Sequence, residues 1–119
     1  MATSRAIPLS AHAAIEMIAA PAIMATPLLL GFGAAATVVV FGFGALLLGL
    51  AIQAAGPGRT IPLSAHAGFD YVLAALAGIS GLAIGIATGE WAQGVFLAGI
   101  GVALVALTAS TRFSVPAGA

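Results

Sequence analysis

The sequence contains neither cysteine nor lysine, and each absence excludes a kind of chemistry. Without a thiolate, the chain can form no disulfide, no cysteine-ligated zinc site and no iron–sulfur cluster. Without lysine, it can form no Schiff base, so a covalently bound retinal is excluded. The three basic residues are all arginines, and any chemistry of the chain must come from its histidine and carboxylate side chains.

Charge is also scarce in this chain. Of its 119 residues, 5% are charged and 62% are hydrophobic, and the mean hydropathy is +1.23. A soluble domain carries charge on about a quarter of its residues, so water is the wrong solvent for this composition. A bilayer suits it, because lipid accepts an apolar exterior when the backbone is satisfied within helices. The net charge is zero, which leaves no basic surface and excludes a nucleic-acid partner.

An internal repeat organises the chain. The heptapeptide at 7–13, Ile-Pro-Leu-Ser-Ala-His-Ala, recurs letter for letter at 61–67, and Arg5 stands at the same offset as Arg59. The offset indicates a duplicated unit of roughly 54 residues. We therefore divide the chain into a first and a second repeat, at residues 1–58 and 59–119.

Each repeat is long enough for two membrane-spanning helices. A helix needs about 20 apolar residues to cross a bilayer, and the apolar runs here are continuous, unlike the alternating pattern of barrel strands. We predict an all-α membrane protein with four transmembrane helices, arranged as two helical hairpins. The predicted spans are residues 9–30, 35–55, 63–87 and 91–110. Ser10 and Ser64, near the starts of two spans, are predicted to cap those helices.

The arginines predict the orientation in the membrane. With four spans, Arg5, Arg59 and Arg112 all fall on one side of the bilayer. The positive-inside rule assigns that side to the cytoplasm, so both termini are predicted to be cytoplasmic. Because each repeat has an even number of spans, the hairpins are predicted to be parallel and related by a pseudo-twofold axis along the membrane normal.

Small residues indicate where helices pack. Four of them follow one another at four-residue spacing in the third span, which lets helix backbones approach closely: Ala77, Gly81, Gly85 and Gly89. Ala45 and Gly49 form a shorter stripe on the second span. Packing within the bundle is the first interpretation of these stripes, and contact with another subunit or a second copy of the chain is the alternative.

One polar constellation could carry chemistry. His12 and Glu16 are four residues apart, as are His66 and Asp70, and this spacing places each pair on one helix face. Ionisable groups are costly in lipid and usually face a partner or the bundle interior. A pseudo-twofold axis would bring the two pairs to equal depth, where they could face each other.

Three interpretations of this constellation stay open. The first is a structural knot, in which the pairs bond to each other and fix the helix register. The second is a site for a divalent metal or for haem, since imidazoles and carboxylates from facing helices suit zinc or non-haem iron. The third is a path for protons or ions. The leading interpretation includes no cofactor; a divalent metal or haem belongs only to the second one.

No catalytic signature is present, and we expect a protein that is not an enzyme. The sequence has no zincin motif, no Gly-x-Ser-x-Gly elbow and no paired aspartates of an intramembrane protease. Its apolar faces and minimal mass outside the membrane favour a structural or accessory subunit of a larger membrane assembly. The expected partners are the lipid bilayer and other membrane subunits or further copies of the chain.

The repeat unit resembles the SPW-repeat family of small bacterial membrane proteins. The family pattern has a histidine, an acid four residues later that is often part of Asp-Tyr, then Ser-Pro-Trp and Gly-Phe. Here His66 through Asp70-Tyr71 matches its opening, and His12 through Glu16-Met17 matches with glutamate in place of aspartate. Thr26-Pro27-Leu28 stands where Ser-Pro-Trp is expected, without the tryptophan. The resemblance implies a protein of the bacterial inner membrane with two such units, and it implies no activity.

Overall fold

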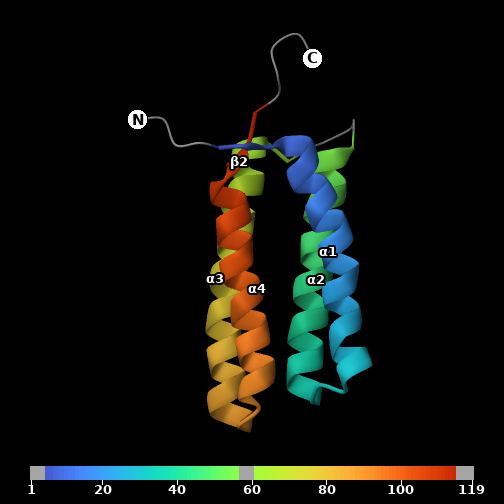
Figure 1. Ribbon diagram of the computed structural model, residues 1–119, viewed down its shortest axis with the longest axis vertical. Coiled ribbons are helices and arrows are strands. Elements are labelled where there is room, and N and C mark those ends of the chain that lie inside the picture. The colour runs from blue at the N-terminus through green and yellow to red at the C-terminus, as the bar shows by residue number, and fades with distance from the viewer. Residues whose placement is uncertain (1–4, 57–60, 115–119) are drawn as a thin grey trace.

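The computed structural model describes residues 5–56 and 61–114, and these contain four long helices (Figure 1). The helices are α1 (Leu9–Leu30), α2 (Ala34–Ala55), α3 (Leu63–Thr88) and α4 (Trp91–Ala109), with two short strands, β1 (Ile7–Pro8) and β2 (Thr111–Arg112). Each helix is long and apolar enough to cross a membrane. The predicted all-α fold is confirmed, and every helix end lies within one residue of its predicted position.

The helices pack as two hairpins. α1 lies against α2 and α3 lies against α4, and the hairpins meet mainly where α2 contacts α3. In Figure 1 the chain enters and leaves the bundle at the same end, and the turn inside each hairpin lies at the other end. The hairpins therefore run in parallel. The division into sequence repeats at 1–58 and 59–119 stays a prediction.

Glycine ends the first helix of each hairpin. Gly31 and Gly89 have φ angles of 68° and 74°, a left-handed conformation that costs glycine little. Their N–H groups donate to the carbonyl oxygens of Pro27 and Gly85, which closes the last turn of α1 and of α3. The predicted role of Gly89 in helix packing is wrong, because it terminates α3 and a Cβ there would meet nothing within 4 Å.

Prolines, not serines, precede α1 and α3. Pro8 and Pro62 occupy the N-cap positions, and no capping side chain acts there. Ser10 and Ser64 are the second residues of their helices, beyond the position from which an N-cap side chain reaches the free N–H groups. The predicted capping role of the two serines is therefore corrected.

Small residues let α3 and α4 approach closely. A Cβ added at Gly81 would collide with the carbonyl oxygen of Gly94, and one added at Gly94 would collide with Gly81. Gly85 faces the ring of Trp91 in the same way, and Ala77 is buried on the same side of α3. These three members of the predicted stripe thus lie inside the second hairpin.

The two hairpins are tied together at the end that carries their turns. The N–H of Gly33, in the turn between α1 and α2, donates to Oε1 of Gln93 at 3.1 Å. The rings of Phe32 and Phe96 meet edge to face with their centroids 5.5 Å apart. One polar and one aromatic contact therefore join the first turn to the start of α4.

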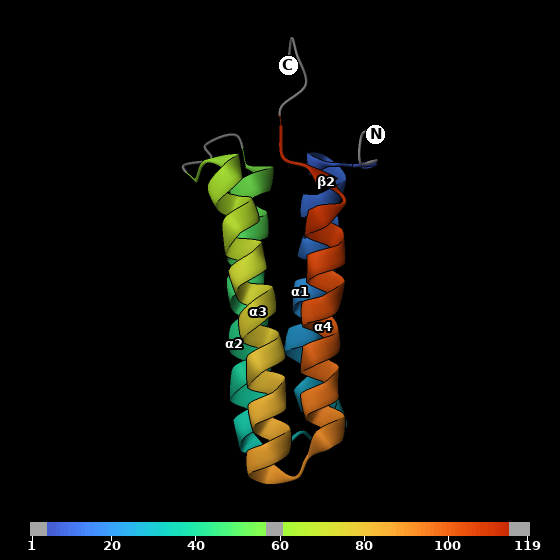
Figure 2. The ribbon, with the colours of Figure 1, turned by 90° about the vertical axis from the view of Figure 1, so that its left-hand side faces the viewer.

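The opposite end is joined by the two strands. β1 and β2 pair in parallel, and the N–H of Ile7 donates to the carbonyl oxygen of Ser110 at 3.1 Å. Figure 2 shows the segment after α4 beside the start of α1. Arg5 lies two residues before β1 and Arg112 lies in β2, so both arginines, which are exposed, are at this end. Arg59, the third topology residue, lies outside the described residues.

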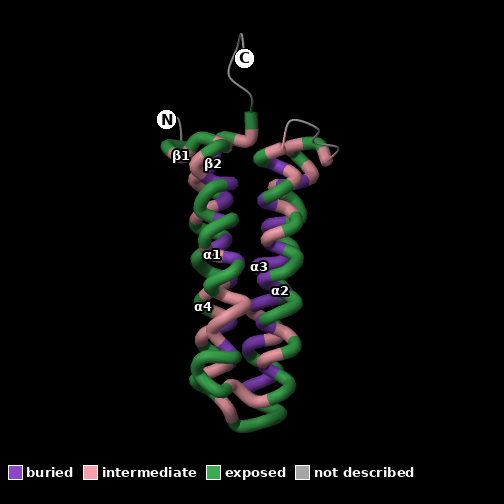
Figure 3. The backbone as a smooth tube through the Cα atoms, turned by 90° about the vertical axis from the view of Figure 1, so that its right-hand side faces the viewer, coloured by how far each residue is buried: buried purple, intermediate pink, exposed green. Residues whose placement is uncertain are grey.

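Burial follows the bundle axis. The tube in Figure 3 shows buried positions turned toward the centre and exposed positions around the outside. The outer surface is strongly apolar: Leu29 is 81% exposed, Ile18 76% and Val38 72%. Such a surface is stable in lipid and would associate in water, so the fold supports a multi-span membrane protein.

Candidate functional site

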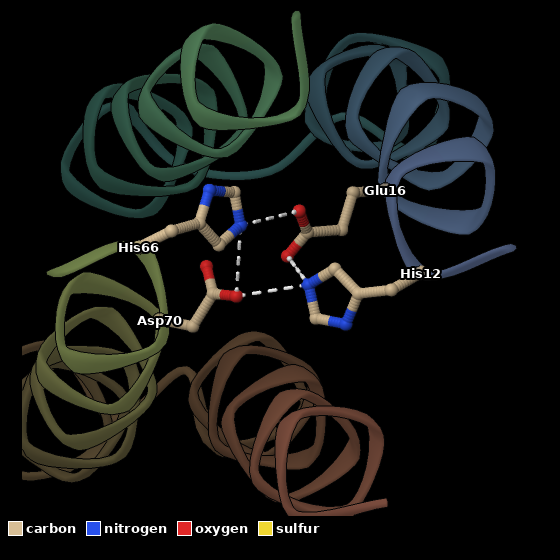
Figure 4. Close-up of side chains that lie close together, drawn as sticks. All are labelled: His12, Glu16, His66 and Asp70. Carbon is tan, nitrogen blue, oxygen red and sulfur yellow. Dashed lines mark hydrogen bonds and ion pairs between the residues drawn. The ribbon is translucent and has the colours of Figure 1, made fainter. Parts of the chain in front are cut away.

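The structure brings the two predicted polar pairs together at the centre of the bundle. His12 and Glu16 project from α1, and His66 and Asp70 project from α3, one helical turn apart within each pair (Figure 4). The same view shows α1 and α3 across from each other, with α2 and α4 between them. All four residues are at most 1% exposed.

Each imidazole contacts both carboxylates. Nε2 of His12 lies 2.9 Å from Oδ2 of Asp70 and 3.1 Å from Oε2 of Glu16. Nε2 of His66 lies 3.2 Å from Oδ2 of Asp70 and 3.4 Å from Oε1 of Glu16. One nitrogen or oxygen from each of the four side chains lies within 4.8 Å of the other three. The four groups thus converge on one point.

The histidines alone cannot satisfy this cluster. Each Nε2 can carry one hydrogen at most, whereas the two carboxylates present four oxygens. Nε2 of His12 hydrogen-bonds to Oδ2 of Asp70. In the part of the chain that the structure describes, both oxygens of Glu16, Oδ1 of Asp70 and Nε2 of His66 make no hydrogen bond despite these short distances. Buried polar atoms are normally paired, and either two protonated imidazoles or a bound cation would balance the two carboxylates.

A four-coordinate metal ion would fit among these four side chains if they moved closer together. Zinc bound by nitrogen and oxygen at about 2.0–2.2 Å places neighbouring ligand atoms roughly 3.3–3.6 Å apart. The four nitrogen–oxygen distances run from 2.9 to 3.4 Å but involve both oxygens of Glu16, and one ligand atom from each residue lies within 4.8 Å of the others, so a tetrahedral ion would need the side chains to close in around it. With one ligand atom from each residue, the ion would contact Nε2 of His66 and one of the two unpaired oxygens of Glu16.

Two residues near the end of α4 complete the site. Oγ1 of Thr111 lies 2.8 Å from Nδ1 of His12, on the side of the ring that faces away from the carboxylates. The ring of Phe113 packs against both imidazoles, with centroid distances of 5.0 Å to His12 and 5.8 Å to His66. Sequence reasoning missed both residues, because no repeat or spacing links them to the histidines.

The geometry argues against haem and against a continuous ion path. Oxygens of Glu16 and Asp70 lie close to both Nε2 atoms, in the space that a porphyrin ring between the imidazoles would need. Beyond the cluster, the buried centre is lined by apolar side chains such as Ala20, Val40 and Leu97. A conducting path through the described core would need polar groups there.

Glu90, the third acid of the chain, lies at the far end of the bundle. It follows the C-cap of α3, and a Cβ at Gly33 would lie 3.1 Å from its Oε1 atom. Glu90 therefore sits by the turns and takes no part in the cluster.

No family model matches this chain, and no similar protein was found among the curated proteins or the solved structures. The predicted membership of the SPW-repeat family therefore stays a prediction. Fold and composition define the class as a small α-helical membrane protein with four spans.

Proposed function

We propose that this protein binds one divalent transition-metal ion, with zinc as the best match, inside its membrane-spanning bundle. The observation that carries the proposal is the convergence of four buried ligand atoms, one each from His12, Glu16, His66 and Asp70, within 4.8 Å of one another. The polar knot predicted as an alternative uses the same residues, but it leaves most of the carboxylate oxygens without a hydrogen bond.

Charge is balanced in the metal-bound site, as it also is when both imidazoles are protonated. Two carboxylates carry two negative charges, which a divalent ion neutralises when both imidazoles are in their neutral, ligating form. Isolated charge inside a bilayer costs about 2.5–3.5 kcal/mol per group on insertion scales, so a neutral site is strongly preferred there. A bound ion therefore removes the cost of burying Glu16 and Asp70 within the helices.

The donor set favours zinc over the commoner divalent cations. Calcium takes six to eight oxygen ligands, and magnesium demands octahedral oxygen coordination with several waters. Two imidazole nitrogens and two carboxylate oxygens in a compact, buried arrangement suit a four-coordinate ion. The four protein ligands also leave no open position for a substrate, which favours a structural or stored ion over a catalytic one.

Metal loading of the purified protein tests this proposal. The chain is solubilised in detergent, stripped with a chelator, dialysed against zinc with excess magnesium and calcium, and analysed for its elements. We expect about one zinc ion per chain, with neither competitor retained, because the site has two nitrogen ligands. Protein that returns from dialysis without zinc would refute the proposal.

We further propose that the bundle lies in a bacterial inner membrane with both termini in the cytoplasm. Support comes from Arg5 and Arg112, which are exposed beside and in the paired strands at one end of the bundle. The metal site then lies near the cytoplasmic face, since Glu16 is about 10 Å along α1 from its start. The orientation is tested by fusing to the C-terminus a reporter enzyme that is active only outside the cytoplasm. We expect no reporter activity, and an active reporter would contradict the proposed orientation.

Association with another membrane subunit is a second candidate role, as the sequence predicts. The supporting observation is on α2, where a Cβ at Gly42 or Gly49 would meet nothing within 4 Å and Ala45 is also exposed. Among the residues that the structure describes, nothing packs against Gly42 and Gly49, and these positions would let a further helix approach closely. Native mass measurement after gentle solubilisation tests this role; the mass of a single chain would overturn it.

A further inference from the structure

Thr111 holds His12 from outside the four-residue cluster. Its Oγ1 atom lies 2.8 Å from Nδ1 of His12 and 2.6 Å from the carbonyl oxygen of Leu107, to which it donates. A hydroxyl has a single hydrogen, and here the carbonyl oxygen receives it. In the contact with His12, Oγ1 must therefore accept, and Nδ1 of His12 must carry a hydrogen.

This hydrogen bond keeps a hydrogen on Nδ1 of His12 and points Nε2 toward the carboxylates. Nε2 of His12 donates to Asp70 at 2.9 Å and lies 3.1 Å from Glu16; if a metal ion replaces the hydrogen on Nε2, the hydrogen kept on Nδ1 leaves a neutral ring with its lone pair on Nε2. Metal-ligating histidines almost always donate their other ring N–H to a nearby acceptor, which fixes the tautomer and the ring orientation. The two successive hydrogen bonds, from His12 to Thr111 and from Thr111 to Leu107, have this arrangement.

We infer that Thr111 is a positioning residue of the metal site, an inference that rests on the proposed function. Thr111 does not contact the ion; it presents Nε2 of His12 as a ligand by holding Nδ1. The end of α4 and strand β2 thereby belong to the site, although their sequence shares no pattern with the histidines.

The surrounding structure keeps Thr111 in place. Thr111 is fully buried, and it pairs with Ile7 in the short parallel sheet of β1 and β2. Two residues further on, the ring of Phe113 packs against His12 and His66. Backbone pairing therefore holds Thr111, and the ring of Phe113 packs against the imidazole that the Thr111 hydroxyl contacts, as a positioning role requires.

Two variants of Thr111 and one matched control test the inference. Thr111→Val keeps the shape of the side chain and removes the hydroxyl, whereas Thr111→Ser keeps the hydroxyl. Thr108→Val makes the same change one turn earlier on α4, at a buried hydroxyl with no hydrogen-bond partner in the described part of the chain. Zinc affinity is measured by competition with a chelator, and cobalt absorption reports the coordination geometry.

We expect Thr111→Val to weaken zinc binding by about 10–100-fold, the usual effect of losing an outer-shell partner, and to weaken the visible bands of tetrahedral cobalt. Thr111→Ser should restore both readouts to within a few fold, and Thr108→Val should leave both unchanged. Equal zinc affinity and equal cobalt spectra in wild type and Thr111→Val would overturn the inference. Wild-type protein that binds neither ion would instead overturn the proposed function, so the two failures are distinguishable.

Discussion

Replacing Glu16 with glutamine should abolish tight zinc binding, with a loss above the roughly 100-fold limit of outer-shell substitutions. Glutamine has nearly the same size as glutamate, so the packing of α1 is kept, but the site loses one anionic ligand and half of its negative charge. A divalent ion would then carry an unbalanced positive charge inside the bilayer. Zinc retained after dialysis, compared with wild type, measures the effect.

Glu90→Gln is the matched control for this experiment. It makes the same chemical change in the acid that lies by the turns at the far end of the bundle, so zinc binding should be unchanged. Equal loss of zinc in both variants would mean that total charge, not the cluster, governs binding. Full zinc binding by Glu16→Gln would exclude Glu16 as a ligand.

The same variant separates the metal site from a purely structural knot. If the cluster serves only to join α1 to α3, Glu16→Gln should lower the thermal stability of the metal-free protein, because it breaks a buried ion pair. If the cluster is a metal site, the variant should mainly remove the extra stability that zinc gives to the wild type, since a ligand that binds only the folded state stabilises it. Melting curves with and without zinc give both quantities.

A methyl group at Gly81 should destabilise the second hairpin by about 1–3 kcal/mol, the range for overpacked sites. The added Cβ of Gly81→Ala would collide with the carbonyl oxygen of Gly94 and lie 3.0 Å from the backbone nitrogen of Ala98. Both are backbone atoms, so α3 and α4 would have to move apart. Thermal unfolding in detergent should show a lower melting temperature.

Gly78→Ala is the control on the same helix. Gly78 lies almost one turn before Gly81, and a Cβ there would meet nothing within 4 Å. This variant should be neutral or slightly stabilising, because alanine favours a helix by up to about 1 kcal/mol over glycine. Equal melting temperatures for the two variants would contradict the close contact between α3 and α4.

The spans were predictable because hydropathy and helix breakers act locally. Long apolar runs must form helices in lipid, and the turn at Gly31 marks a helix end by its own sequence. The pairing of His12 with Glu16 and of His66 with Asp70 was also readable, from spacing alone. Whether the two pairs meet was not, since that depends on how two hairpins pack.

The rest of the site could not be predicted, because its residues come together only through tertiary contacts. Thr111 reaches His12 only because α4 returns to the start of α1 and β2 pairs with β1. The prediction of serine caps was wrong for a local reason. Pro8 occupies the N-cap position of α1, and Ser10 lies inside the helix. Gly89 fits the four-residue spacing of the stripe but adopts the left-handed conformation that ends α3.

X-ray absorption at the zinc edge, recorded on loaded wild-type protein, tests the central claim most directly. We expect four nitrogen or oxygen neighbours at about 2.0–2.2 Å, with the outer-shell scattering of two imidazole rings. A six-coordinate shell of oxygen without imidazole scattering would show that zinc binds elsewhere and would contradict the assignment of His12, Glu16, His66 and Asp70 as its ligands.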